Sequence, residues 1–139
     1  MEKVTSEKQL KITTENRPGT LSEIAGLIAA DGVNIENFCA YSCGGQAILH
    51  LITNDNGKAG RALEGRGFQI EEQEVILLRL WNRPGTLASV TSRLKPHGIN
   101  LDHIYGTSSM AGERITAVFS SDDNAKALEI FHSLVVDEN

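Results

Sequence analysis

The feature that most constrains the fold of this chain is a six-residue string that it contains twice. Asn-Arg-Pro-Gly-Thr-Leu stands at residues 16–21 and again at residues 82–87. At the same offset of 66 positions, Gly-Val-Asn-Ile at residues 32–35 aligns with Gly-Ile-Asn-Leu at residues 98–101. Because the spacing is kept without a gap across most of the unit, duplication of one structural unit is the economical explanation.

The match extends to apolar positions along both copies. The offset aligns Leu10 and Ile12 with Ile76 and Leu78, Phe38 with Ile104, and Leu49 and Ile52 with Ile115 and Val118. No linker rich in Gly, Ser or Pro separates the copies. We therefore expect a first domain at residues 1–73 and a second domain at residues 74–139.

Both copies begin with the same predicted elements. Leu10 and Ile12 alternate with polar residues, which predicts a half-buried strand. Apolar residues recur at helical spacing after each string, at Leu21, Ile24, Ala25 and Ile28, and at Leu87, Val90 and Leu94. Gly32 and Gly98 follow, and glycine is the preferred residue where a helix ends.

Two more strands, a second helix and a fourth strand complete the unit. Strands are expected at residues 33–41 and 47–52, and the three-residue spacing of Ile35 and Phe38 indicates a β-bulge. The second helix is indicated by Ala59, Ala62 and Leu63, and in the copy by Ala125, Leu128 and Phe131. Residues 68–70 supply the fourth strand, whereas residues 134–136 are either a short strand or a continuation of the helix.

This order predicts the fold class. It is α+β: two tandem ferredoxin-like βαββαβ units, each with an antiparallel four-stranded sheet and with its helices on one face.

Composition limits the partners and the compartment. The 139 residues carry a formal charge of −5, whereas nucleic acids and anionic membranes attract basic surfaces. The first ten residues are polar, and no apolar run is long enough to cross a bilayer. Two cysteines are too few for a disulfide framework and fit a reducing compartment. We expect a cytoplasmic protein that binds neither nucleic acid nor membrane.

The repeated string combines groups suited to a small dipolar molecule. Its proline fixes φ near the helical value, and its glycine lets a ligand approach the backbone closely. The amides that follow lie at the positive end of the helix dipole. Asn16, or Asn82 in the copy, adds a carboxamide that both donates and accepts hydrogen bonds, as a zwitterionic amino acid requires. In the simpler alternative the string only shapes a helix start, since Thr20 to Glu23 also fits a capping box.

These strings, placed on a βαββαβ frame, resemble the ACT domain. This is a regulatory amino-acid-binding module attached to many enzymes of amino-acid metabolism. Glu15 with the first string, followed by Gly-Val-Asn, is especially similar to the serine-binding ACT domain of phosphoglycerate dehydrogenase. The resemblance covers nearly every residue from Gln9 onward, and the whole chain is similar to small stand-alone proteins of two tandem ACT domains.

The resemblance implies a ligand site at each strand–helix loop. Asn16 and the amides after Pro18 would hold the α-carboxylate or α-ammonium group, and Asn34 would contribute from the adjacent subunit or domain. The implied ligand-binding residues are Thr14, Asn16, Arg17, Pro18, Gly19, Thr20, Leu21, Asn34 and Ile35, and in the copy Asn82, Gly85, Thr86, Leu87, Asn100 and Leu101.

One departure from the family pattern ranks the two loops. Serine-binding relatives have a histidine at the end of the first strand, where this chain has Thr14 and, in the copy, Leu80. This difference argues against serine itself as the ligand. Because a threonine hydroxyl can hydrogen-bond a ligand and leucine cannot, the first loop is favoured.

The other chemistry-bearing residues do not indicate a second site. Cys39 and Cys43 lack the Cys-x-x-Cys spacing of metal-carrying relatives and are interpreted as packing residues. His97 is interpreted as a helix cap residue, and His50 and His132 as solitary surface or edge positions. No metal or cofactor is expected, and no nucleophile motif or carboxylate pair indicates catalysis.

Our first hypothesis is an amino-acid sensor, in which ligand at domain or subunit interfaces shifts the arrangement of the units. The alternative is a ligand-free interaction or dimerisation module that regulates a metabolic enzyme, and an enzyme of unknown type comes third. The expected partners are a free amino acid, a second copy in a homodimer, and an unidentified metabolic enzyme or regulator. Arg17 and Arg83 are expected to form surface ion pairs or to orient the loops rather than to hold the ligand.

Overall fold

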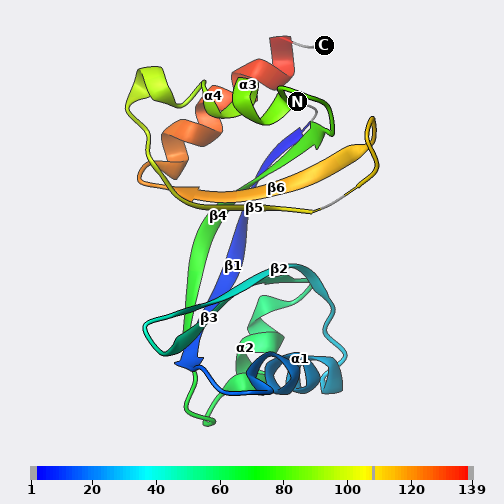
Figure 1. Cartoon of the computed structure of the whole chain (residues 1–139), viewed down its shortest axis with the longest axis vertical. Coiled ribbons are helices and arrows are strands. Elements are labelled where there is room, and N and C mark those ends of the chain that lie inside the picture. The colour runs from blue at the N-terminus through cyan, green and yellow to red at the C-terminus, as the bar shows by residue number, and fades with distance from the viewer. Residues whose placement is uncertain (1–2, 108, 138–139) are drawn as a thin grey trace. The chain divides into compact units, whose positions relative to one another are not determined.

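The computed structural model describes residues 3–107 and 109–137, which form a mixed succession of strands and helices (Figure 1). The strands are β1 (Lys3–Glu15), β2 (Ile35–Cys43), β3 (Gln46–Thr53), β4 (Gln69–Trp81), β5 (Leu101–Gly106) and β6 (Arg114–Ser121). The helices are α1 (Thr20–Ala30), α2 (Asn56–Leu63), α3 (Thr86–Thr91) and α4 (Asn124–Asp137), with a short 3-10 helix η1 (Lys95–His97). The fold class is α+β, as predicted.

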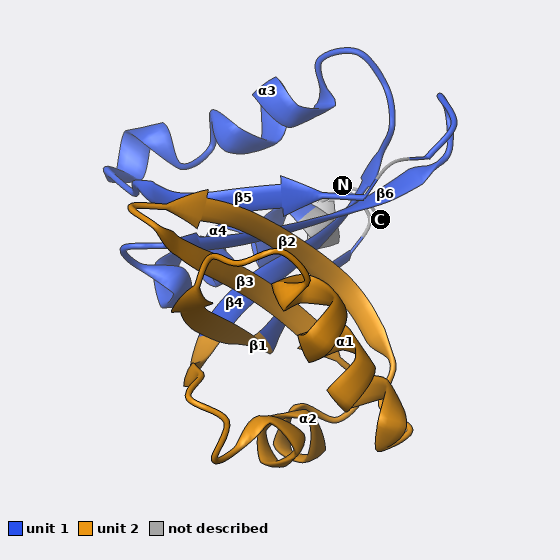
Figure 2. Ribbon diagram, turned by 60° about the horizontal axis from the view of Figure 1, so that its bottom comes forward, with its two compact units in different colours: residues 1–7, 74–139 blue, residues 8–73 orange. Residues whose placement is uncertain are grey.

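The six strands form one antiparallel sheet in the order β2-β3-β1-β4-β6-β5. The chain packs as two compact units (Figure 2). Residues 8–73 form the first-repeat unit, and residues 1–7 with residues 74–139 form the second-repeat unit. β1 and β4 each run from one unit into the other, so the beginning of β1 belongs with the second repeat. The division into independent domains at residues 1–73 and 74–139 stays a prediction.

In the first-repeat unit, α1 and α2 cover one face of the strands. Ile24 and Ile28 of α1, and Ala59 and Leu63 of α2, have no exposed surface. They pack against strand residues that alternate onto the same face, Leu10, Ile12, Ala47, Leu49 and Leu51. The hydrophobic spacing predicted from the sequence therefore identifies the buried face of both helices.

The second-repeat unit has a matching core with larger side chains. Val90 of α3 and Ala127 and Phe131 of α4 pack with Val4, Ile76, Leu78, Leu80, Leu94, Ala117 and Phe119. The rings of Phe119 and Phe131 meet edge to face, with 5.8 Å between their centroids. Because Val4 lies in this core, the first residues of β1 are packed into the second repeat.

The repeat is not gapless, which corrects part of the sequence alignment. Leu10 on β1 pairs with Leu51 on β3. Its equivalent Ile76 on β4 pairs with Phe119 on β6, which stands 68 positions after Leu51 rather than 66. The connection between β5 and β6 is therefore longer by 68 − 66 = 2 residues. Beyond it the offset is 68, so the predicted equivalence of Leu49 and Ile52 with Ile115 and Val118 is wrong.

Hydrogen bonds at the start of the second helix repeat at the corrected offset. The N–H of Thr53 donates to Oδ1 of Asn56, and the N–H of Ser121 donates to Oδ1 of Asn124. The carboxamide of Asn56 then donates to a backbone carbonyl oxygen of β1, and that of Asn124 donates to a backbone carbonyl oxygen of β4. The same shift places Ala127, rather than the predicted Ala125, in the core, and Ala125 is exposed.

Two predicted local features are confirmed in both copies. Register shifts between Ile35 and Asn37 in β2, and between Leu101 and His103 in β5, are the expected bulges. Gly32 and Gly98 follow α1 and η1 with φ of 73° and 65°. This left-handed conformation favours glycine and ends each helical segment. Residues 134–136 continue α4 and are not a strand.

Two leucines predicted on buried helix faces are exposed instead. Leu21 in the first turn of α1 is 45% exposed, and Leu87 in the first turn of α3 is 58% exposed. Neither belongs to the core of its unit. On the edge strands β2 and β5, Phe38 and Ile104 are also exposed. Each unit therefore presents an apolar pair at equivalent positions.

No helix in the described ranges is both long and apolar enough to cross a membrane.

Candidate functional site

The first string forms a type II β-turn between β1 and α1. The N–H of Thr20 donates to the carbonyl oxygen of Arg17 at 3.2 Å, which closes the turn. Gly19 occupies the third position with φ 86° and ψ 0°. Type II turns favour proline at the second position and require positive φ at the third. Turn geometry, rather than helix geometry, therefore accounts for Pro18 and Gly19.

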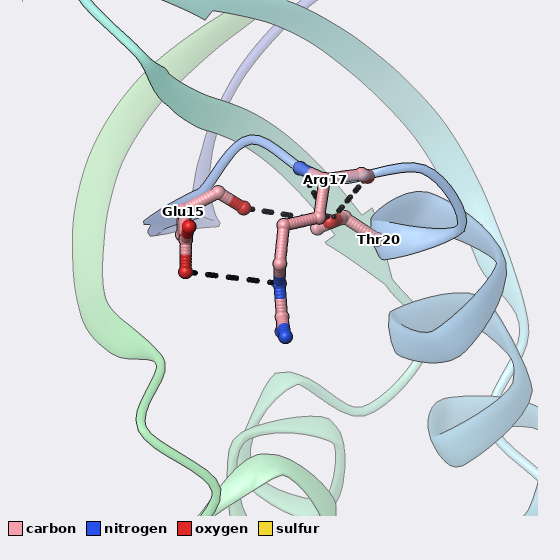
Figure 3. A network of polar contacts seen from close by, with 3 residues as sticks. All are labelled: Glu15, Arg17 and Thr20. Atoms are coloured by element: carbon pink, nitrogen blue, oxygen red, sulfur yellow. Dashed lines mark hydrogen bonds and ion pairs between the residues drawn. The ribbon is translucent and has the colours of Figure 1, made fainter.

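The side chain of Thr20 stabilises this turn from inside (Figure 3). Its hydroxyl donates to the carbonyl oxygen of Arg17 at 2.8 Å and lies 3.4 Å from that of Glu15. Thr20 itself is only 6% exposed. The helix is capped by Gly19, which has no side chain to cap with, so the predicted capping box from Thr20 to Glu23 is wrong.

One of the backbone amides predicted to be free is hydrogen-bonded within the turn, whereas others have no hydrogen-bond acceptor in the described ranges. The N–H of Thr20 is bonded within the turn, and the N–H of Glu23 makes the first helical bond, to Gly19. Among the described residues, the N–H groups of Leu21 and Ser22 have no acceptor. These two amides lie in the first turn of an 11-residue helix, where the helix dipole is positive.

Two polar side chains belong to the same connection between β1 and α1. Asn16 is exposed, and its backbone N–H donates to the carbonyl oxygen of Gly45 at 3.1 Å. Its carboxamide has no hydrogen-bond partner within the described part of the chain. Thr14 is half-buried and pairs with Ala47, and its place in the alternation of β1 puts it on the face that α1 covers. The loop thus offers donors and acceptors with spare capacity.

Arg17 turns away from this group. Its guanidinium Nε lies 3.9 Å from Oε2 of Glu15 (Figure 3). Both side chains are mostly exposed. This confirms that Arg17 forms a surface ion pair. At such exposure the pair is worth little to the free energy of unfolding, about 0–1 kcal/mol.

The second string has the same backbone turn. The N–H of Thr86 donates to the carbonyl oxygen of Arg83 at 3.2 Å, and Gly85 has φ 85° and ψ −9°. Asn82, however, is bound to the hairpin between β5 and β6. Its side-chain Nδ2 donates to the carbonyl oxygen of Ser109 at 2.9 Å, and its backbone carbonyl oxygen accepts from the N–H of Gly112 at 2.8 Å. The carboxamide predicted to meet a ligand holds the protein's own hairpin.

The arginine of the second string also has a different neighbour. Trp81 stands where the first repeat has Glu15, and the guanidinium of Arg83 lies 4.7 Å from the centroid of its ring. The guanidinium of Arg114 lies 4.2 Å from the same ring. Arg83 therefore packs on an aromatic surface and forms no ion pair within the described ranges, so of the two predicted roles the ion pair is wrong and the orientation of the loop stays a prediction.

Asn34 lies at the opposite end of the first-repeat sheet from Asn16. Ile35 pairs with Thr53 at the end of β3, whereas the β1–α1 loop adjoins Gln46 at its start. The seven-residue step along β3 puts roughly 20 Å between Asn34 and the loop. Asn100 and Leu101 have the same relation to the loop of Asn82. One unit alone does not bring the two predicted groups of ligand-binding residues together.

Other predicted positions behave differently from expectation. His50 is 3% exposed, and its ring contacts Nε2 of Gln9 at 3.1 Å and the hydroxyl of Tyr41 at 3.2 Å. The interpretation of His50 as a surface position is therefore wrong. Cys43 is exposed and Cys39 half-buried, so the packing role holds at most for Cys39. The described residues contain no cluster of three or more metal-ligating side chains.

A family model described as an ACT domain pair matches residues 5–137. No curated protein matches the chain in sequence.

Three solved structures illustrate the structural similarity. A protein from Bacteroides thetaiotaomicron superimposes with a TM-score of 0.85 at 26% identity, covering 94% of this chain and 89% of that one. The ligand-free regulatory subunit of aspartate kinase from Thermus thermophilus gives 0.66 at 16% identity over 94% and 95%. Aspartate kinase from Clostridium acetobutylicum gives 0.56 at 14% identity over 94% of this chain and 33% of that one. The two kinase structures share the fold.

Proposed function

Because this chain belongs to the family of ACT domain pairs, a class of regulatory modules, we propose that it binds a free amino acid at the β1–α1 loop of its first repeat. We propose no catalytic role for the chain itself. The observation that carries the proposal is the contrast between two equivalent asparagines. The Asn16 carboxamide has no partner among the described residues, whereas that of Asn82 holds the β5–β6 hairpin.

The groups around the first loop match the two ends of an amino acid. The N–H groups of Leu21 and Ser22 are positioned to donate to an α-carboxylate at the start of α1. The carboxamide oxygen of Asn16 and the hydroxyl of Thr14 are acceptors suited to an α-ammonium group. Gly19 leaves the approach open, since a Cβ at this position would meet no atom within 4 Å.

We further propose that two copies of the chain complete the site. Asn34 lies roughly 20 Å from the loop of its own unit, and we propose that it reaches a ligand bound at the loop of another copy. β2 is an edge strand of the sheet, Phe38 on this strand is exposed, and Leu21 in the first turn of α1 is exposed as well. An antiparallel contact between two such edges follows two-fold symmetry and covers both apolar side chains. We propose that each unit then has a four-stranded ACT sheet, which consists of two strands of its own and its portions of β1 and β4.

Binding at such an interface supplies a regulatory signal. A ligand that touches two copies stabilises the paired arrangement over any other, by the difference between its affinities for the two states. The output requires a further protein, which we propose is a metabolic enzyme or regulator in the cytoplasm. The regulatory subunit of aspartate kinase from Thermus thermophilus shares this fold.

A ligand screen tests the proposal directly. The melting temperature of the full chain is measured with each free amino acid at millimolar concentration, because a ligand that binds only the folded state raises it. We expect one amino acid, or one chemically related group, to raise the melting temperature. If none does, the sensor function is refuted.

The alternative function, a ligand-free dimerisation module, rests on the exposed pairs Leu21 with Phe38 and Leu87 with Ile104. It predicts a dimer whose dissociation constant is unaffected by every amino acid tested. Analytical ultracentrifugation of the wild type and of Phe38→Glu, with and without the ligand found in the screen, separates the two functions. A ligand-dependent dimer supports the sensor, and a ligand-independent dimer lost in Phe38→Glu supports the module.

A further inference from the structure

The second-repeat unit contains a groove between α3 and α4 that the amino-acid site does not use. A cavity of about 340 Å³ is lined by Arg83, Thr86, Ser89 and Arg93, among others. A second cavity of about 470 Å³ shares Ser89 and Arg93 with the first and continues to His97. Because the two cavities share part of their walls, they form one groove, which we name the α3–α4 groove.

The α3–α4 groove is positively charged in an acidic protein. Arg83 and Arg93 both line its first cavity. Neither guanidinium has a carboxylate partner among the residues that the structure describes. The chain has 18 acidic residues and 13 basic ones, so these two arginines are unpaired although acidic side chains are in excess. A concave site lined by one sign of charge concentrates ions of the opposite sign.

Two hydroxyl groups in the groove also have spare hydrogen-bonding capacity. The hydroxyl of Ser92 donates to the carbonyl oxygen of Ser89, and that of Ser133 donates to the carbonyl oxygen of Ile130. The hydroxyls of Thr86 and Ser89 make no hydrogen bond within the described ranges. The first cavity therefore combines two guanidinium groups with two free hydroxyl donors.

Arg83 is held in place without losing its donors. Its guanidinium lies 4.7 Å from the centroid of the Trp81 ring. A guanidinium that packs on an aromatic face keeps its N–H edge available for a planar, two-point contact with an oxyanion. The indole thus positions the arginine, whereas the Glu15 carboxylate of the first repeat pairs with the guanidinium of Arg17.

The first repeat provides an internal comparison for this groove. At the offset of 66, Ser89, Arg93 and His97 correspond to Glu23, Leu27 and Asp31. The same helix position on the duplicated fold thus carries two carboxylates and a leucine in the first repeat. Because α1 folds with those residues, the basic side chains along the α3–α4 groove are not a requirement of the fold.

We propose that the α3–α4 groove binds a phosphoryl group, free or as part of a small phosphorylated metabolite. A phosphoryl group carries up to two negative charges and has three acceptor oxygens. Arg83 and Arg93 match its charge, and Thr86 and Ser89 donate to its remaining oxygens. This site lies in the second repeat and takes an anion, so it is distinct from the proposed amino-acid site at Asn16.

The test is a titration of the full chain with inorganic phosphate, without amino acids and at ionic strength held constant with sodium chloride. Backbone amide chemical shifts locate the binding site, and Trp81 fluorescence reports on the guanidinium of Arg83. We expect shifts centred on Thr86, Ser89 and Arg93. Arg93→Leu, which installs the residue of the first repeat, is expected to weaken phosphate binding roughly tenfold or more.

Arg79→Gln is the matched control. It removes the same charge from an exposed position of β4 in the same unit. This position lies on the sheet face opposite Leu78 and Leu80 of the core, so the variant should leave phosphate affinity unchanged. The melting temperature of each variant confirms that it is folded. The proposal is overturned if Arg93→Leu binds phosphate as the wild type does, if the shifts centre elsewhere, or if succinate produces an equal response. None of these outcomes bears on Asn16 or the amino-acid site.

Discussion

The two loops of the duplicated string share one backbone and differ in chemistry. Both form a type II turn closed by the threonine amide, with glycine φ of 86° and 85°. In the first loop the asparagine carboxamide has no described partner, and a carboxylate neutralises the arginine. In the second, the asparagine holds a hairpin and the arginine packs on Trp81. The same geometry therefore supports two different surfaces.

The difference shows which residues the fold demands. Proline and glycine recur because the turn needs restricted φ and positive φ, whereas among the described residues the threonine hydroxyl is hydrogen-bonded within the turn only in the first repeat. The residues around the turn diverge, and the two extra hairpin residues bring the carbonyl oxygen of Ser109 within 2.9 Å of the Asn82 carboxamide. A repeated motif thus predicts repeated structure, whereas each copy has to be examined separately for function.

The largest expected effect compares the two cores. Phe131→Ala should lower the free energy of unfolding by about 3–5 kcal/mol, since it creates a large cavity. It also removes the edge-to-face contact with Phe119, which has no counterpart at the equivalent Leu63. Leu63→Ala should therefore cost less, and Phe131→Leu, which copies the first repeat, should cost under about 1.5 kcal/mol. Urea unfolding measures all three, and equal costs for the two alanine variants would contradict the comparison.

The next effect tests what the loops share. Gly19→Ala and Gly85→Ala should each lower the free energy of unfolding by about 1–2 kcal/mol, because alanine disfavours left-handed φ. A Cβ would meet no atom within 4 Å at either position, so backbone conformation alone sets the cost and the two values should agree. Gly26→Ala, at an open position inside α1 with ordinary φ, is the control and should stabilise by roughly 0.5–1 kcal/mol. Thermal unfolding distinguishes these signs.

Much of the fold was predictable because local rules and the repeat agree. Alternation identified β1 and the face it buries, helical spacing identified Ile24 and Ile28, and both bulges followed from the broken alternation in β2 and β5. The assignment of residues 1–7 to the second repeat was not predictable, because strand pairing between distant segments leaves no periodic signal. The two-residue insertion between β5 and β6 was not predictable from the sequence, because apolar residues of β6 align with the first repeat at an offset of 66 as well as at 68.

Less of the candidate site was predictable. The string located the loops and the proline and glycine positions, but the partner of Asn82 depends on a hairpin 27 positions later. The exposure of Leu21 and Leu87 was also missed, because helical spacing cannot tell where the covered part of a helix begins. The α3–α4 groove could have been suspected from the replacement of Glu23, Leu27 and Asp31 by Ser89, Arg93 and His97.

A crossed pair of variants separates binding from stability at the two asparagines. Asn82→Ala should lower the free energy of unfolding by about 1 kcal/mol, because the Ser109 carbonyl loses its part-buried donor. It should leave amino-acid binding unchanged. Asn16→Ala should do the reverse, leaving stability within about 0.5 kcal/mol and weakening the ligand-induced rise in melting temperature. The opposite pattern would move the proposed amino-acid site to the second repeat.

The smallest expected effect tests the corrected alignment of the repeats. Oδ1 of Asn54 accepts the N–H of Asn34 at 2.9 Å, and Oδ1 of Asp122 accepts the N–H of Asn100 at 3.0 Å. Asp122 corresponds to Asn54 only at the offset of 68. Asp122→Asn therefore keeps the hydrogen bond and should change the free energy of unfolding by less than about 0.5 kcal/mol.

Asp122→Ala is the matched control, since it removes the acceptor and should cost about 1 kcal/mol. Thermal unfolding of both variants, together with hydrogen exchange at the Asn100 amide, checks the assignment. Protection at that amide should survive in Asp122→Asn and fall in Asp122→Ala. If the asparagine variant is as unstable as the alanine variant, the bond depends on the carboxylate charge. The two repeats would then have diverged in the contacts that begin the second strand as well as in their loops.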